Sequence, residues 1–145
     1  MHHTELFSRK NYFLAFENFI AAPAPGCALR LVCRGSENET DLLLNLDGTV
    51  DRWQIDFQSY AFYSATAEDF SFATAPELHE ASACYIHEDS GLLRFLKQST
   101  NLEEQQYARS VSYRHVAFAC MEHQVDVVSA HEPSVQLVEK KRDTV

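Results

Sequence analysis

Histidines beside acidic residues are the side chains of this sequence best suited to chemistry. They form three short groups, His79-Glu80, His87-Glu88-Asp89 and His131-Glu132. Imidazole and carboxylate together suit zinc, iron or manganese. However, the sequence has no H-E-x-x-H or H-x-H spacing, and the groups fall at predicted strand ends and turns, where polar residues gather in any protein. We therefore predict surface histidines, with no metal and no other cofactor.

If a metal site exists, His79, His87 and His115 are the best candidate ligands. His115 is the most interesting of them because it lies on an otherwise apolar strand face, although a half-buried, hydrogen-bonded histidine is the simpler interpretation. Serines, cysteines and acids are available for a nucleophilic site, but the sequence contains no G-x-S-x-G motif. Its four glycines form no phosphate-binding loop.

The cysteines give no sign of a zinc site or of disulfide bonds. Cys27, Cys33, Cys84 and Cys120 contain no C-x-x-C pair, and each lies in an apolar, strand-like stretch. A free cysteine packs as a small hydrophobic side chain. We predict buried free thiols.

Acidic residues are concentrated in the middle of the chain. The net charge is −9, and residues 35–93 alone hold twelve acids against one base, Arg52, for a formal charge of −11. Phosphate binding needs clustered Lys and Arg, so this charge disfavours a nucleic acid or an anionic membrane as partner. It favours a basic protein partner.

Length and composition predict one domain. A chain of 145 residues with 46% hydrophobic residues can build one real core. No apolar run approaches the roughly 20 residues of a membrane span, and no signal peptide is evident at the N-terminus, so we expect a cytoplasmic protein. We expect a single domain over 1–145 with a charged, frayed tail at about 139–145.

The strongest β signal lies between Ser112 and Val138. Side chains alternate over 113–122, and both faces are apolar, which predicts a central strand covered on each side. A turn at 122–124, a second strand and an edge strand over 134–138 follow. Dimerisation through this apolar region is compatible with the sequence.

The first half of the chain predicts a three-stranded meander over 27–57. Its strands are 27–34, 41–46 with Leu42, Leu44 and Leu46 inward, and 50–57, with Asp47-Gly48 as a hairpin turn.

Helices are expected on both sides of this meander. We favour a helix over about 5–20, with a strand over 12–16 as the alternative, and expect a second helix over 91–99 that Asp89 or Ser90 caps. A further helical turn over 102–108 and strands over 60–64 and 81–86 complete the set. The predicted class is α+β, with a mainly antiparallel sheet of about six to eight strands.

The aromatic residues beside the acids are candidates for binding. Tyr60 and Tyr63 precede Glu68-Asp69, and exposed tyrosines supply contact area at low entropic cost. Packing of each ring in the core is the competing interpretation, and Trp53 is expected in the core unless its strand face is open. The candidate binding residues are Trp53, Tyr60, Tyr63, Glu68, Asp69, Glu88 and Asp89.

Two functional hypotheses follow. The first is a non-enzymatic module that masks a basic partner surface, such as an immunity-type inhibitor of a nuclease-like toxin or an adaptor. An even spread of the twelve acids over the folded surface would argue against it. The second is a small-molecule or metal-dependent enzyme that uses His79, His87 or His115 with Glu80, Glu88 or Asp89. The missing catalytic motifs favour the first.

Overall fold

The computed structural model describes residues 4–70 and 82–142. In chain order its elements are α1 (Thr4–Phe7), β1 (Phe13–Ala24), β2 (Cys27–Ser36), α2 (Glu39–Leu44), β3 (Asp51–Phe57), β4 (Phe62–Ala67), the 3-10 helix η1 (Glu68–Phe70), β5 (Cys84–His87), α3 (Gly91–Ser99), α4 (Leu102–Arg109), β6 (Arg114–Met121), β7 (His123–Ser129) and β8 (Ser134–Glu139). None of the helices in these ranges is long and apolar enough to cross a membrane.

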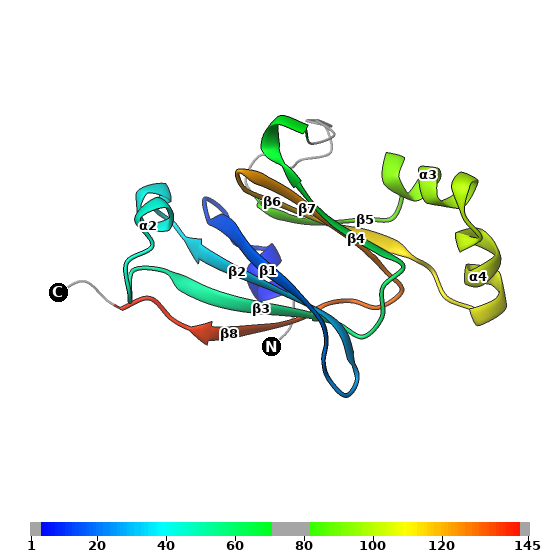
Figure 1. Ribbon diagram of the computed structural model, residues 1–145, viewed down its shortest axis with the longest axis horizontal. Coiled ribbons are helices and arrows are strands. Elements are labelled where there is room, and N and C mark those ends of the chain that lie inside the picture. The colour runs from blue at the N-terminus through cyan, green and yellow to red at the C-terminus, as the bar shows by residue number, and fades with distance from the viewer. Residues whose placement is uncertain (1–3, 71–81, 143–145) are drawn as a thin grey trace.

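The strands form one mixed sheet of eight. Its order is β4-β7-β6-β1-β2-β3-β8, and β5 pairs with β6. Among the strands of the described ranges, β1 and β6 alone run parallel, over the pairs Leu14 with Cys120 and Ala15 with Met121. Figure 1 shows β1, β2, β3 and β8 in one half of the molecule and β4, β5, β6 and β7 in the other, with α3 and α4 at one end. The predicted α+β class with a mainly antiparallel sheet is confirmed.

The main core lies between the two halves of this sheet. Trp53, Ile55 and Phe57 alternate along β3 and are fully buried, as are Phe118 of β6 and Val125 of β7. Leu93 and Leu96 of α3 form a second cluster with Val128 on the opposite face of β7. The β6–β7 hairpin is therefore covered on both faces, as its alternating sequence predicts.

The predicted N-terminal helix over 5–20 is wrong in extent. The helix α1 stops at Phe7, and β1 begins at Phe13. The apparent helical spacing of Phe16 and Phe19 arises from a β-bulge: Phe16 pairs with Cys33 and Phe19 with Leu31, so Glu17 is the extra residue. The bulge keeps both rings on the core side although they are three residues apart.

The predicted strand over 41–46 is also wrong, because this segment contains α2. Asn38 caps the helix by accepting a hydrogen bond from the Thr40 amide at 2.8 Å, and Asn45 ends it in the left-handed conformation. Only Leu42 is buried. The Asn38 cap and the acidic residues of the first turn stabilise a helix here, although the leucines alternate as in a strand. A three-stranded meander does exist, but it consists of β1, β2 and β3.

The C-terminal prediction holds for β8, which is an edge strand. The residues after it are attached to the domain by the backbone. The Lys141 amide donates to Asp51 Oδ1 at 2.7 Å, and the Arg142 amide donates to the Gly48 carbonyl at 2.8 Å. These bonds hold residues 141 and 142 of the expected tail against the start of β3.

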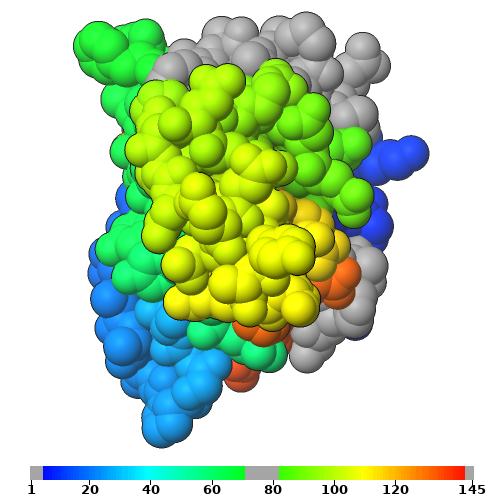
Figure 2. Space-filling model, turned by 90° about the vertical axis from the view of Figure 1, so that its right-hand side faces the viewer, coloured from blue at the N-terminus to red at the C-terminus, as the bar shows by residue number. Residues whose placement is uncertain are grey.

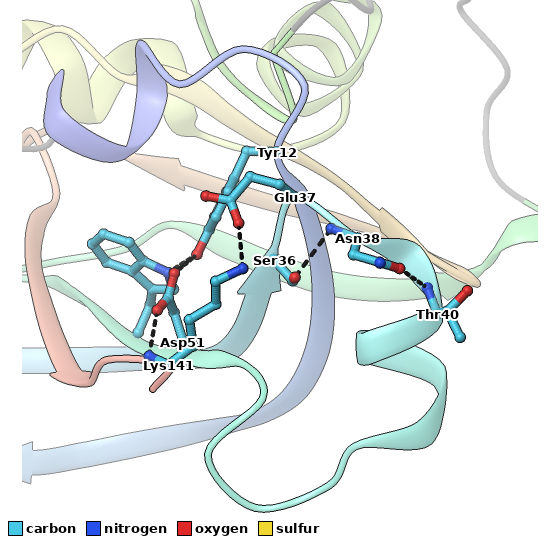
Figure 3. Close-up of polar contacts among 8 residues, drawn as sticks. Tyr12, Ser36, Glu37, Asn38, Thr40, Asp51 and Lys141 are labelled. Atoms are coloured by element: carbon cyan, nitrogen blue, oxygen red, sulfur yellow. Dashed lines mark hydrogen bonds and ion pairs between the residues drawn. The ribbon is translucent and has the colours of Figure 1, made fainter. Parts of the chain in front are cut away.

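A buried polar network joins both ends of the chain to the core (Figure 3). The Tyr12 hydroxyl donates to Asp51 Oδ2 at 2.5 Å and accepts from Trp53 Nε1 at 2.8 Å. Burial, reinforced by the hydrogen bond to Asp51, raises the pKa of Tyr12 well above its ordinary value. The Tyr12 ring also lies so close to Gly35 that a Cβ there would meet the hydroxyl at 2.3 Å. Position 35 must therefore be glycine for the Tyr12 ring to keep this place.

Tyr12→Phe is expected to lower the free energy of unfolding by about 2–3 kcal/mol. The substitution keeps the ring but removes one hydrogen-bond partner from Asp51 and the acceptor of the Trp53 indole. Urea denaturation measures the change. Tyr60→Phe is the matched control, because the Tyr60 ring is 40% exposed and should change stability by less than about 0.5 kcal/mol. Equal effects of the two substitutions would contradict the role of the network.

Alkaline pH is expected to weaken the fold through Tyr12. The unfolded chain releases this proton near pH 10, whereas the raised pKa keeps the buried phenol protonated in the folded state. The contribution of Tyr12 to stability is therefore complete below about pH 10 and falls as pH rises above it. The difference in unfolding free energy between wild type and Tyr12→Phe should shrink between pH 9 and pH 11. A constant difference would contradict the prediction.

Candidate functional site

A row of aromatic rings crosses from β1 to β4 on the core side of the sheet. Ring centroids lie 5.3 Å apart for Phe16 and Phe19, 4.7 Å for Phe19 and Tyr63, and 5.1 Å for Tyr63 and Tyr60. Tyr63 pairs with Val127, a core residue, so the two side chains share one face. The sheet thus brings together rings that are more than forty residues apart in the sequence.

The rings become more exposed toward β4. Phe16 and Phe19 are partly buried against the main core, whereas Tyr63 is 37% and Tyr60 40% exposed. Among the described strands, β4 pairs with β7 alone and ends the strand order. The two tyrosines therefore form the rim of the core, where they reach solvent.

Acidic residues follow directly at the far end of β4. The Glu68 amide donates to the Glu122 carbonyl at 2.9 Å, which fixes the start of η1 beside the β6–β7 turn. Glu68 and Asp69 are exposed, and Phe70 is 79% exposed. We call this surface the β4 strip, and it consists of Tyr60, Tyr63, Glu68, Asp69 and Phe70.

The other predicted binding residues lie elsewhere. Trp53 is fully buried and donates to Tyr12, so its core interpretation is confirmed and it offers no surface to a partner. Glu88 and Asp89 lie at the turn between β5 and α3. Asp89 forms an ion pair with Arg94 at 2.9 Å. Four of the seven candidates therefore lie along β4, Tyr60 and Tyr63 at its start and Glu68 and Asp69 after its end, and the exposed Phe70 lies next to them although it was not among the candidates.

The acids of residues 35–93 do not form a single acidic face. At least four of them have internal partners: Glu37 pairs with Lys141, Asp51 with Tyr12, Asp56 with Arg30 and Asp89 with Arg94. The other described acids lie at three separate places, α2 with its following turn, the end of β4 and the β5–α3 turn (Figure 1). Glu77 and Glu80 lie outside the described residues. The concentration in sequence is therefore only partly a concentration in space.

The strongest arrangement for chemistry is a buried hydrogen-bond chain through His115. Its Nδ1 lies 2.9 Å from Ser90 Oγ and its Nε2 lies 2.6 Å from Asp126 Oδ1. The His87 ring lies 5.1 Å from the His115 ring. The register of the β6–β7 hairpin explains why His115 meets Asp126. Asp126 pairs with Ala117, which lies two residues beyond His115 on the same face of the sheet.

This chain resembles a nucleophile relay in its order of serine, histidine and acid, but its surroundings indicate a structural role. Ser90 is only 1% exposed, and its Oγ already accepts from the Leu93 amide at 3.1 Å as the cap of α3. Its hydroxyl proton is then available for His115 Nδ1, which leaves Nε2–H for Asp126. Figure 2 shows α3 and α4 covering this end of the molecule. The chain fastens α3 to the sheet.

Within the part of the chain that it describes, the structure does not bring the predicted metal ligands together as one group. His87 and His115 do come together, but Glu88 is exposed and Asp89 pairs with Arg94, so the carboxylate beside His115 is Asp126 instead. Across 4–70 and 82–142, no group of three or more His, Cys, Asp or Glu side chains could hold a metal ion. His79 and Glu80 lie outside the described residues. Asp126 could have been suspected from the sequence as the one acid within a β-branched strand.

The cysteines are all free thiols, as predicted. Cys33 and Cys84 are buried, while Cys27 and Cys120 are partly buried. Burial raises the pKa of the Cys120 thiol to about 12, and it raises the pKa values of Cys33 and Cys84 well above the ordinary range. Thiols held protonated in this way are poor nucleophiles.

Comparisons with known proteins add no identification. The chain matches no protein-family model, no curated protein and no solved structure.

Ser90→Ala is expected to lower the free energy of unfolding by about 1–2 kcal/mol, because it removes both the cap of α3 and the hydroxyl partner of His115. Urea denaturation measures the change, and Ser112→Ala is the control, since Ser112 is exposed before β6. A fluorophosphonate probe should leave Ser90 unlabelled in the folded protein. Covalent labelling of Ser90 would instead assign it to an active site.

Proposed function

We propose that this protein is a non-enzymatic protein-binding module that uses the β4 strip to contact a basic partner. The observation that carries the proposal is the exposure at both ends of the edge strand β4: the partly exposed Tyr60 and Tyr63 lie at its start, and Glu68, Asp69 and the 79% exposed Phe70 follow its end. Aromatic anchors beside charged residues are a common composition of protein interfaces.

The packing behind the strip supports its use in binding. Tyr63 lies against Phe19, which itself packs on the main core, so the tyrosine ring is partly ordered before any partner arrives. A preordered aromatic side chain loses little conformational entropy on binding. Phe70 is a large apolar side chain left almost entirely in water. Burial of such a ring against a partner stabilises a complex by about 1.5–3 kcal/mol.

The charge of the strip favours a basic partner. Glu68 and Asp69 are adjacent, exposed acids in a molecule with a formal net charge of −9. Complementary charge accelerates association and makes it sensitive to salt. The division of the remaining acids over three places limits the direct acidic contact to the end of β4. An inhibitor of a nuclease-like toxin and an adaptor are two concrete forms of such a module.

The enzyme hypothesis has one observation in its favour, the hydrogen-bond chain from Ser90 through His115 to Asp126. Substrate would have to reach Ser90, which is 1% exposed and already bound to the backbone of α3. The β4 strip needs no such rearrangement, so we prefer the binding module.

The β4 strip is tested by retrieving partners from the source cell at low salt and measuring the affinity of the purified partner. Phe70→Ser should raise the Kd at least tenfold, or about 1.4 kcal/mol, as expected for an interface anchor. Glu68→Gln combined with Asp69→Asn should slow association and weaken its dependence on salt.

The control is Tyr107→Ser, which removes a 91% exposed ring from α4, away from the strip. It should leave the Kd unchanged within twofold. Affinity that is insensitive to Phe70→Ser and to the double charge variant would refute the β4 strip. A partner that binds equally well at high salt would refute the basic character of the contact.

A further inference from the structure

A second exposed apolar surface lies at the opposite end of the sheet from α3 and α4. Leu43 is 65% exposed, Leu44 61% and Leu46 59%. These three apolar side chains belong to α2 and its following turn, with Asn45 between the last two, and are here called the leucine patch. Figure 1 places α2 at the opposite end of the molecule from α3 and α4, and none of the three leucines belongs to β4 or η1. The patch is therefore distinct from the β4 strip.

The fold does not need these three leucines. Leu42 is the buried leucine of α2 and packs with Ala15 and Val50. Arg34 Nη1 secures the same turn by donating to the Leu42 carbonyl at 3.0 Å. Successive helical residues are rotated by about 100°, so a helix that turns Leu42 inward must turn Leu43 and Leu44 outward. Polar residues would fill the outward positions at no cost to the core, and grouped exposed leucines are typical of interaction surfaces.

The surroundings of the leucine patch are mainly acidic. Glu39, Asp41 and Asp47 lie within α2 or next to it. Of the described bases nearby, Lys141 pairs with Glu37 at 2.9 Å. The Arg142 side chain lies against Gly48, beside one of the three acids, so acids outnumber bases around the patch. An apolar centre with an acidic rim complements an apolar recess with a basic rim.

We infer that the leucine patch docks into an apolar recess rimmed by Lys or Arg on a protein partner. Two other occupants fit less well. A second copy of this chain would bring the same three acids against the first set, and like charges at a contact cost several kcal/mol. An anionic membrane surface would repel the same rim. The inference does not depend on the β4 strip, and either surface can fail without the other.

A photo-crosslinking experiment tests the leucine patch. The full chain carries benzoylphenylalanine in place of Leu43 in the source cell, and a second chain carries it in place of Phe95, which is 60% exposed on α3. We expect position 43 to crosslink to a protein that position 95 does not reach, at an apolar residue with Lys or Arg nearby. Leu43→Ser combined with Leu44→Ser should then weaken binding of that purified protein at least tenfold, whereas Phe95→Ser should change it by less than twofold.

Several results would overturn the inference. Crosslinks from position 43 to a second copy of this chain, to lipid or to an acidic surface would each assign a different occupant. The same crosslinks from positions 43 and 95, or none from either, would show that the patch has no specific partner. An unchanged affinity of the double leucine variant would do the same. Because both leucines are exposed, the variant should unfold at the wild-type urea concentration, and Phe70→Ser reports separately on the β4 strip.

Discussion

The carboxylate of Asp51 is the group on which the rest of the structure depends. It is 5% exposed and lies at the start of β3, where Tyr12 donates to one oxygen and the Lys141 backbone to the other. A buried carboxylate without such partners is costly by several kcal/mol. The entry to β1 and the segment after β8 must therefore both reach the same point, which holds β1, β2, β3 and β8 in one half of the sheet. Trp53, bonded to Tyr12, fills the centre of that half.

A second buried hydrogen-bond network connects elements in the other half of the sheet, which contains β4, β5, β6 and β7. Ser90, His115 and Asp126 join the first turn of α3 to β6 and β7 by hydrogen bonds, over a face where Leu93 meets Val128. These hydrogen bonds attach α3 to the sheet. The two surfaces that we propose for interaction, the β4 strip and the leucine patch, contain none of the residues of these two networks.

The sequence predicts the parts of the fold that depend on local periodicity. Alternation located β3, β6 and β7, and the cap at Ser90 located the start of α3. The wrong predictions fall where the spacing of apolar residues is typical of the other kind of secondary structure. The bulge at Glu17 gives β1 the spacing of a helix, and the leucines of α2 alternate like a strand although only Leu42 is buried. Whether such a segment becomes a helix or a strand depends on its pairing with distant strands, and a single sequence does not reveal that pairing.

The candidate site shows the same division. Tyr60, Tyr63, Glu68 and Asp69 could be proposed from composition, because all four are close in sequence. The contact of Tyr63 with Phe19 depends on how β1 and β4 lie in the folded sheet, and the separation of Glu88 and Asp89 from these four residues depends on the position of β5. Charge counted along the chain likewise overestimated the acidic surface, since Asp51 and Asp56 are held by internal partners.

The most direct test of the central claim is a map of backbone amide shifts on titration with the basic partner. Binding through the β4 strip predicts that the largest shifts fall at residues 60–70 and at the β6–β7 turn, while α3 and α4 stay unchanged. Shifts concentrated around His87, His115 and the start of α3 would contradict the binding module and point to a site at the buried histidines.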